Sequence, residues 1–106
     1  MGVKDDLASH VSLCRKLARD YRVASEVRGR WMALAEREPA DHDARTRRFE
    51  AGMREDAAWR LLFAATGRLV VEGRPELAAE IRQSALRQAT LLGLRAMRTA
   101  LREVAA

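Results

Sequence analysis

The alternation of apolar and polar residues along the chain predicts three long helices joined by two short polar turns. Each turn contains one of the two prolines, at Pro39 and at Pro75. The segments between the turns are rich in Ala, Leu, Arg and Glu, which are strong helix formers. We therefore expect helices near residues 3–37, 42–71 and 75–104.

The first predicted helix carries two apolar stripes that do not line up. In its first half, apolar residues recur at spacings of four and three, which is typical of a helix face packed on a core. In its second half, the apolar residues Val27, Trp31 and Leu34 are displaced by more than about 100° around the helix. Either the helix bends near Gly29, or its second half packs against something different. The residues of the first stripe are Leu7, Val11, Cys14, Ala18 and Tyr21.

The second predicted helix changes character along its length. It is amphipathic at its start, where Phe49 and Met53 lie at helical spacing, but residues 57–71 are apolar on nearly every side. A helix that is apolar all round is buried all round, and two neighbours in a three-helix bundle cannot cover it. This predicts self-association or a partner helix that completes a four-helix arrangement. The alternative is that Gly67 ends the helix and residues 68–72 lie irregularly over the core.

The residues assigned to self-association lie within this apolar segment. Trp59 lies in this segment and would be a natural anchor for a partner if its side chain were exposed. Packing in the core is the alternative role for Trp59, and it is the role expected for Trp31 of the first helix as well. The predicted fold is thus an all-α, antiparallel bundle of three long helices, completed by self-association. At 106 residues the chain is long enough to form one self-sufficient domain, residues 1–106. The candidate self-association residues are Trp59, Leu62, Phe63, Leu69 and Val70.

The second turn and the third helix predict a tight helical hairpin. Gly73 can adopt the left-handed conformation that ends a helix, and Pro75 suits the first turn of the next one. The third helix then carries a narrow stripe of small residues, which lets two helix backbones approach closely. The stripe consists of Ala78, Ala85, Ala89, Gly93, Ala96 and Ala100.

Charge gives the one feature with a functional direction. The chain has a net charge of +5 and only two lysines, Lys4 and Lys16, among its 20 basic residues. The third helix concentrates arginines on one face and has no acid between Glu80 and Glu103. Such a face can neutralise phosphates of RNA or DNA, meet an acidic protein surface, or remain solvated. The candidate partner-binding or phosphate-binding residues of this face are Arg87, Arg95, Arg98 and Arg102.

The first turn raises the question of a metal site, because Asp41, His42 and Asp43 follow one another. Adjacent side chains diverge, however, and a compact metal site draws its ligands from separate turns or elements. We expect no metal here and instead expect Asp41 or Asp43 to cap the second helix. The arginines that follow either pair with nearby carboxylates or extend the partner-binding or phosphate-binding set. They are Arg45, Arg47 and Arg48.

No catalytic or cofactor-binding pattern emerges from the sequence. His10 and Cys14 are four residues apart, but they lie in a run that reads as core and have no third polar residue beside them. The acids are spread among arginines at the spacings of surface ion pairs. The sequence has no glycine-rich phosphate loop and no other cofactor fingerprint, so we expect no enzyme and no cofactor.

The location follows from what the composition favours. The single cysteine, Cys14, has no partner within the chain, which favours a reducing compartment such as the cytoplasm. We expect neither a membrane span nor a signal peptide, because no apolar run is long enough and the N-terminal residues include acids.

These observations lead to two main functional hypotheses. The first is a non-enzymatic binding or scaffold protein that acts through protein–protein interaction as a homodimer, or with a helical protein partner. The alternative is a nucleic-acid-binding accessory protein that uses the arginine-rich face of the C-terminal helix. A third, less favoured hypothesis is an enzyme whose site forms between subunits.

Overall fold

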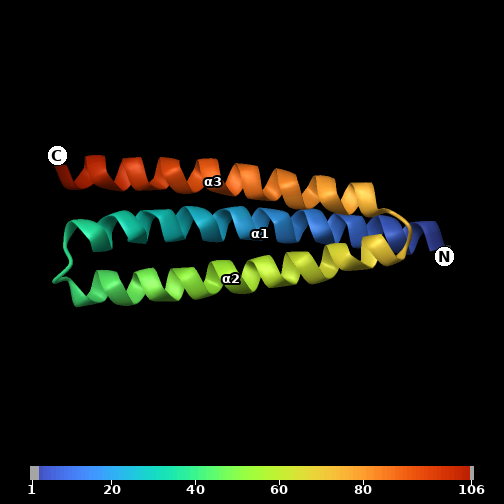
Figure 1. The fold of residues 1–106 in the computed structure, drawn as a ribbon, viewed down its shortest axis with the longest axis horizontal. Helices are drawn as coiled ribbons and strands as arrows, with labels where there is room; N and C mark the ends of the chain where they lie inside the picture. Colours follow the sequence, from blue (N-terminus) through green and yellow to red (C-terminus); the bar gives the residue numbers. More distant parts are fainter. Residues whose placement is uncertain (1–2, 106) are drawn as a thin grey trace.

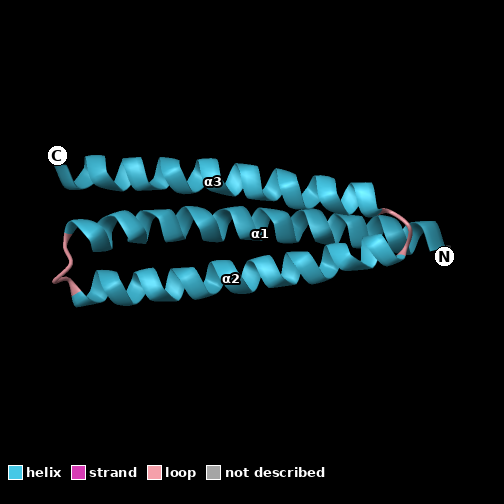
Figure 2. Cartoon of the chain, in the orientation of Figure 1, coloured by secondary structure: helices cyan, strands magenta, loops and turns pink. Residues whose placement is uncertain are grey.

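The computed structural model describes residues 3–105 and confirms an all-helical bundle (Figures 1 and 2). Helix α1 spans Val3–Arg37, α2 spans His42–Val71 and α3 spans Pro75–Ala105. The bundle is a rod with extents of 56 × 21 × 20 Å. The expected helix boundaries are confirmed, apart from one additional residue at the end of α3.

Helix α1 lies between the other two helices (Figure 1). It contacts both of them extensively, whereas α2 and α3 contact each other much less. The up-down-up order makes each sequence neighbour antiparallel and leaves α1 and α3 parallel. Helices α2 and α3 meet at the turn that joins them and diverge toward the other end of the rod. The bundle is therefore closed at one end and open at the other.

Both turns are fixed by local hydrogen bonds. At the first turn, the Asp41 carboxylate accepts a hydrogen bond from the backbone N–H of Ala44, so Asp41 is the predicted N-cap of α2. At the second turn, Gly73 has a φ of 80°, and the N–H groups of Gly73 and Arg74 donate to the carbonyls of Val70 and Leu69. This pattern ends a helix without leaving its last carbonyl groups unpaired.

Helix α2 continues through Gly67 to Val71. The alternative in which residues 68–72 form an irregular piece over the core is therefore wrong. The entire apolar segment of residues 57–71 is helical, and its side chains point in every direction around the axis. Only part of this segment can therefore face α1.

The main core lies in the closed half of the bundle. The predicted first stripe of α1 faces it, since Cys14 is fully buried and Ala18 is 5% exposed. Leu62 and Leu69 of α2 and Ile81 of α3 meet them there. All three helices contribute to this core, which accounts for the close approach of α2 and α3 at this end.

The open half of the bundle is held by small residues. The buried residues of α1 in this half are Ser25, Gly29, Ala33 and Ala35 rather than its larger side chains. Helix α1 runs uninterrupted through Gly29. Its second half packs against the same two helices as its first half, with Gly29 against Gly93 of α3 and Arg28 paired with Glu55 of α2. Val27 is exposed, and Trp31 and Leu34 are half-buried on another side of the helix. This explains why the second apolar stripe is out of line with the first.

Candidate functional site

The clearest candidate site is an apolar surface on α2 that remains largely exposed in the described chain. Its large side chains are more than half exposed: Phe49 69%, Met53 60%, Leu61 60%, Phe63 52% and Val71 87%. Isolated exposed apolar residues are ordinary on a protein surface, but four of these side chains lie within about 80° around α2. They are Phe49, Met53, Phe63 and Val71, whereas Leu61 lies on another side of the helix. Because α1 packs against the opposite side of α2, this surface is available to a second molecule.

The residues proposed for self-association divide between this surface and the core. Leu62 and Leu69 are fully buried and belong to the core of the chain itself, so they cannot contact another molecule in this conformation. Phe63 and Val70 are exposed. Trp59 is half-buried, with its ring 5.2 Å from that of Tyr21 and 6.3 Å from that of Phe63. The set proposed for self-association therefore narrows to Phe63 and Val70, and the half-buried Trp59 packs against Phe63.

Sequence reasoning did not assign Phe49 and Met53 to the candidate site. They form the apolar side of the amphipathic start of α2, yet both lie away from α1. The buried residues in this stretch are the small Ala44 and Ala51, which are 3% and 4% exposed. The sequence does contain a signal for this arrangement, because Ala44 and Ala51 are seven residues apart and therefore lie on one face of the helix, away from Phe49 and Met53.

The outward side of α2 has a regular seam. Positions along it follow one another at spacings of four, three, four, three and four residues, which is the repeat that helices use to pack along their length. At its centre, Arg60 donates to Asp56 at 2.9 Å in an exposed ion pair. We call this set the outer seam of α2. Its members are Phe49, Met53, Asp56, Arg60, Phe63 and Gly67.

Arg82 of α3 borders the outer seam and ties α3 to α2. Its Nε donates to Thr66 Oγ1 at 2.6 Å and its Nη2 donates to the Phe63 carbonyl oxygen at 2.9 Å. The guanidinium carbon also lies 3.9 Å from the centre of the Phe63 ring, which fits a cation–π contact. Phe63 is thereby held in place while half of its surface remains exposed.

The candidate arginines lie on two different surfaces. Arg87, Arg95, Arg98 and Arg102 are all exposed on α3. Arg45 and Arg48 instead line a hollow beside Phe49 and Met53 on α2, together with Arg28.

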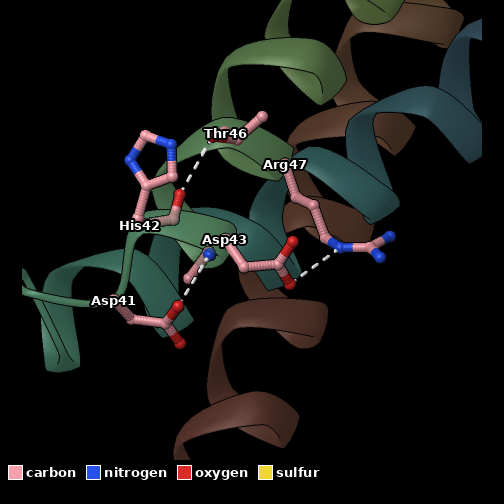
Figure 3. Close-up of polar contacts among 6 residues, drawn as sticks. Asp41, His42, Asp43, Thr46 and Arg47 are labelled. Atoms are coloured by element: carbon pink, nitrogen blue, oxygen red, sulfur yellow. Dashed lines mark hydrogen bonds and ion pairs between the residues drawn. The ribbon is translucent and has the colours of Figure 1, made fainter.

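Arg47 is already engaged within the bundle, near the start of α2 (Figure 3). Its Nε donates to Asp43 Oδ2 at 3.1 Å, and its guanidinium carbon lies 5.3 Å from the centre of the Trp31 ring. The expected pairing of this cluster with nearby carboxylates is therefore found for Arg47, whose partner is Asp43.

Three arginines of α1 that sequence reasoning missed border the groove between α1 and α3. Arg15, Arg19 and Arg22 line a shallow hollow between α1 and α3, together with Glu80, Ile81 and Ser84 of α3. A second hollow along the same groove is lined by Arg30 of α1 and Arg95 of α3. The spacing of four and three residues from Arg15 to Arg22 was the signal that these three side chains share one face.

We call seven of these arginines the basic face: Arg15, Arg19, Arg22, Arg87, Arg95, Arg98 and Arg102. Among the described side chains, none of the seven forms an ion pair or a hydrogen bond, whereas Arg30 pairs with Glu103 at 2.8 Å. Two acids of this groove, Glu26 and Glu80, also have no ion-pair partner in the described part of the chain. The seven arginines and these two acids together carry five positive charges in excess, which equals the net charge of +5 of the whole chain.

The sequence of adjacent polar residues at the first turn has a structural role (Figure 3). Asp41 Oδ1 accepts from the Ala44 N–H at 3.1 Å, and Thr46 Oγ1 donates to the His42 carbonyl oxygen at 3.0 Å. Within the described residues, no group of three or more His, Cys, Asp or Glu side chains is arranged to hold a metal ion.

His10 and Cys14 do not form a nucleophilic pair. His10 Nε2 lies 2.7 Å from the carbonyl oxygen of Ala65, to which it donates in the tautomer that carries the Nε2 proton. The Cys14 thiol is fully buried, and this burial raises its pKa above the ordinary value of 9.0. A raised pKa disfavours the reactive thiolate. Both residues therefore contribute to the packing of the closed half.

In the part of the chain that the structure describes, no helix is both long and apolar enough to cross a membrane. Comparison with protein-family models, curated proteins and solved structures gives no match for this chain.

Proposed function

We propose that the protein is a non-enzymatic scaffold that works as a homodimer, in which the outer seams of two α2 helices pack against each other. The observation that carries the proposal is the exposure of large apolar side chains along one regular seam. Solvating this surface is unfavourable, at roughly 25 cal/mol per Å² of apolar area. Covering it with a second molecule removes that cost.

The sequence of the outer seam supports a second copy as the partner. Its spacing reads the same in both directions, so an antiparallel pair of α2 helices has a two-fold axis at the level of Ala58. In that register Phe49 of each copy lies opposite Gly67 of the other, and Met53 lies opposite Phe63. A large side chain thus meets a small one at each end of the seam, as close packing requires.

Charge complementarity supports the same register. Asp56 of one copy lies opposite Arg60 of the other, and the two-fold axis repeats this contact. The exposed ion pair within each chain therefore becomes part of a four-residue network at the centre of the interface. Opposite charges at these positions favour the antiparallel register and disfavour displaced ones.

A single substitution tests this proposal by its effect on mass. Met53→Glu places a carboxylate against the Phe63 ring of the other copy. We therefore expect this variant to have a mass near the 11.9 kDa of one chain, and the unsubstituted protein to have twice that mass. Val23→Glu is the matched control, because Val23 is 59% exposed on α1 and lies outside the seam. Light scattering after gel filtration at tens of micromolar measures both. A monomeric unsubstituted protein would contradict the proposal.

Two further features support a structural role in the cytoplasm. His10 and Cys14 are engaged in packing rather than held in an open cleft, which favours a scaffold over an enzyme. Cys14 is the only cysteine of the chain, and a lone thiol suits a reducing compartment.

A further inference from the structure

We propose that the basic face binds the phosphate backbone of double-stranded DNA. This goes beyond the scaffold proposal and uses none of the residues of the outer seam. It rests on three arginines of α1 and four exposed arginines of α3, two helices that run parallel. The groove between these helices is lined by Arg15, Arg19, Arg22 and Arg95. Neither helix alone carries this surface.

The arginines of the basic face are free to meet a ligand. None of the seven has an ion-pair partner among the described side chains, while exposed ion pairs occur elsewhere, as in Lys16 with Asp20 and Arg30 with Glu103. Like charges on one surface repel one another, and the guanidinium group matches the geometry of phosphate oxygens. A polyanion lying along the groove relieves this repulsion.

The dimensions of the basic face favour a duplex. Gly29 lies against Gly93, so Arg15 is level with residue 79 of the parallel helix α3. Arg102 lies further along α3, which puts the ends of the face about 35 Å apart at a rise of 1.5 Å per residue. One turn of B-form DNA repeats at about the same distance, roughly 34–36 Å. A straight rod can thus contact phosphates along one full turn.

The absence of a stacking platform argues against single strands. Proteins that bind single-stranded nucleic acid stack successive bases on exposed aromatic rings. Among the residues that line the two hollows, Trp31 alone is aromatic, and the Arg47 guanidinium carbon already lies 5.3 Å from the centre of its ring. Binding therefore rests on phosphate contacts, which carry no sequence preference.

The test is a titration of a labelled 20-base-pair DNA duplex, followed by fluorescence anisotropy between 50 and 200 mM salt. If all seven arginines contact phosphates, the slope of log K against log salt is about −6. The variant Arg19→Gln/Arg95→Gln removes one contact from each hollow. We expect it to weaken binding by 10- to 100-fold, on the order of two lost phosphate contacts, and to reduce the slope by about 2.

The matched control is Arg45→Gln/Arg48→Gln, which removes the same charge from the hollow beside Phe49 and Met53. Unchanged DNA binding in this control supports the proposal that the basic face binds DNA. An equal loss of binding in the control and in Arg19→Gln/Arg95→Gln would overturn it. Absence of duplex binding at 50 mM salt would also overturn the proposal. Tighter binding to the single strand or to duplex RNA would overturn it as well. Displacement of the duplex by polyglutamate at a similar charge concentration would also overturn it, because this result would indicate an acidic protein ligand.

Discussion

Gly29 of α1 and Gly93 of α3 face each other where the backbones of the two parallel helices approach closely. A methyl group on Gly29 would collide with the Gly93 carbonyl group, which is backbone and cannot move aside. A methyl group on Gly93 would instead lie 3.4 Å from the Ser25 carbonyl oxygen, an ordinary contact distance. The two glycines face each other, yet only Gly29 is required by the packing.

This asymmetry predicts opposite outcomes for two identical substitutions. Gly29→Ala forces α1 and α3 apart, and we expect it to lower the free energy of unfolding by about 1–3 kcal/mol. Gly93→Ala fits, and the better helix propensity of alanine contributes up to about 1 kcal/mol of stability. Urea denaturation followed by circular dichroism measures both. Equal destabilisation by the two substitutions would show that the close approach is wrongly described.

The buried Cys14 thiol predicts a loss of stability at alkaline pH. Burial raises its pKa in the folded state above 9.0, so the unfolded chain releases this proton at lower pH than the folded chain does. The free energy of unfolding is therefore unaffected well below pH 9 and falls as pH rises past 9. Burial also raises the pKa of Tyr21, which acts in the same direction.

The measurement for this prediction is the urea midpoint between pH 7 and pH 10.5. Cys14→Ala is less stable at pH 7 because it removes a buried sulfur, but its midpoint should fall less steeply above pH 9 than that of the unsubstituted protein. Parallel curves for the two proteins would mean that the thiol is not protected by burial.

The cap at the start of α2 predicts a difference between neighbouring carboxylates. Asp41 Oδ1 accepts from a backbone N–H, so Asp41→Ala should cost about 1 kcal/mol of stability. Asp43→Ala removes only an exposed ion pair with Arg47, which is worth less than about 0.5 kcal/mol. Thermal unfolding should therefore show a clearly larger decrease in melting temperature for Asp41→Ala, and the reverse order would contradict the assignment of the cap.

The helices and turns followed from the sequence because the signals that define them are local. Pro39, Asp41, Gly73 and Pro75 act on their own backbone or on that of the next few residues. The first core stripe was also predictable, since a periodic row of apolar side chains around Cys14 has one natural orientation. Helix boundaries needed no knowledge of the partner helices.

The open half of the bundle was harder to predict, because small residues pack there and large ones face outward. Val27 and Phe49 are exposed, while Gly29 and Ala51 are buried. Hydrophobic periodicity gives weight to large side chains, and it therefore does not identify the small residues that are buried in this half.

The same limit applies to the apolar segment of α2, where sequence reasoning assigned Leu62 and Phe63 alike to self-association. Leu62 is buried and Phe63 is exposed because of where α1 and α3 lie, which the sequence of α2 alone does not specify.

The most direct test of the homodimer is an exchange of the charges at the centre of the outer seam. In Asp56→Arg, each copy presents an arginine to Arg60 of the other. In Arg60→Asp, each copy presents an aspartate to Asp56 of the other. Each variant alone should therefore be monomeric in sedimentation equilibrium, because like charges face each other twice across the two-fold axis.

An equimolar mixture of Asp56→Arg and Arg60→Asp should restore the dimer, because every facing pair then has opposite charges. We predict a mass of two chains for the mixture and of one chain for each variant alone. Three dimeric samples would mean that the copies associate elsewhere. Monomers in the mixture, beside a dimer of the unsubstituted protein, would contradict the antiparallel register of the outer seam.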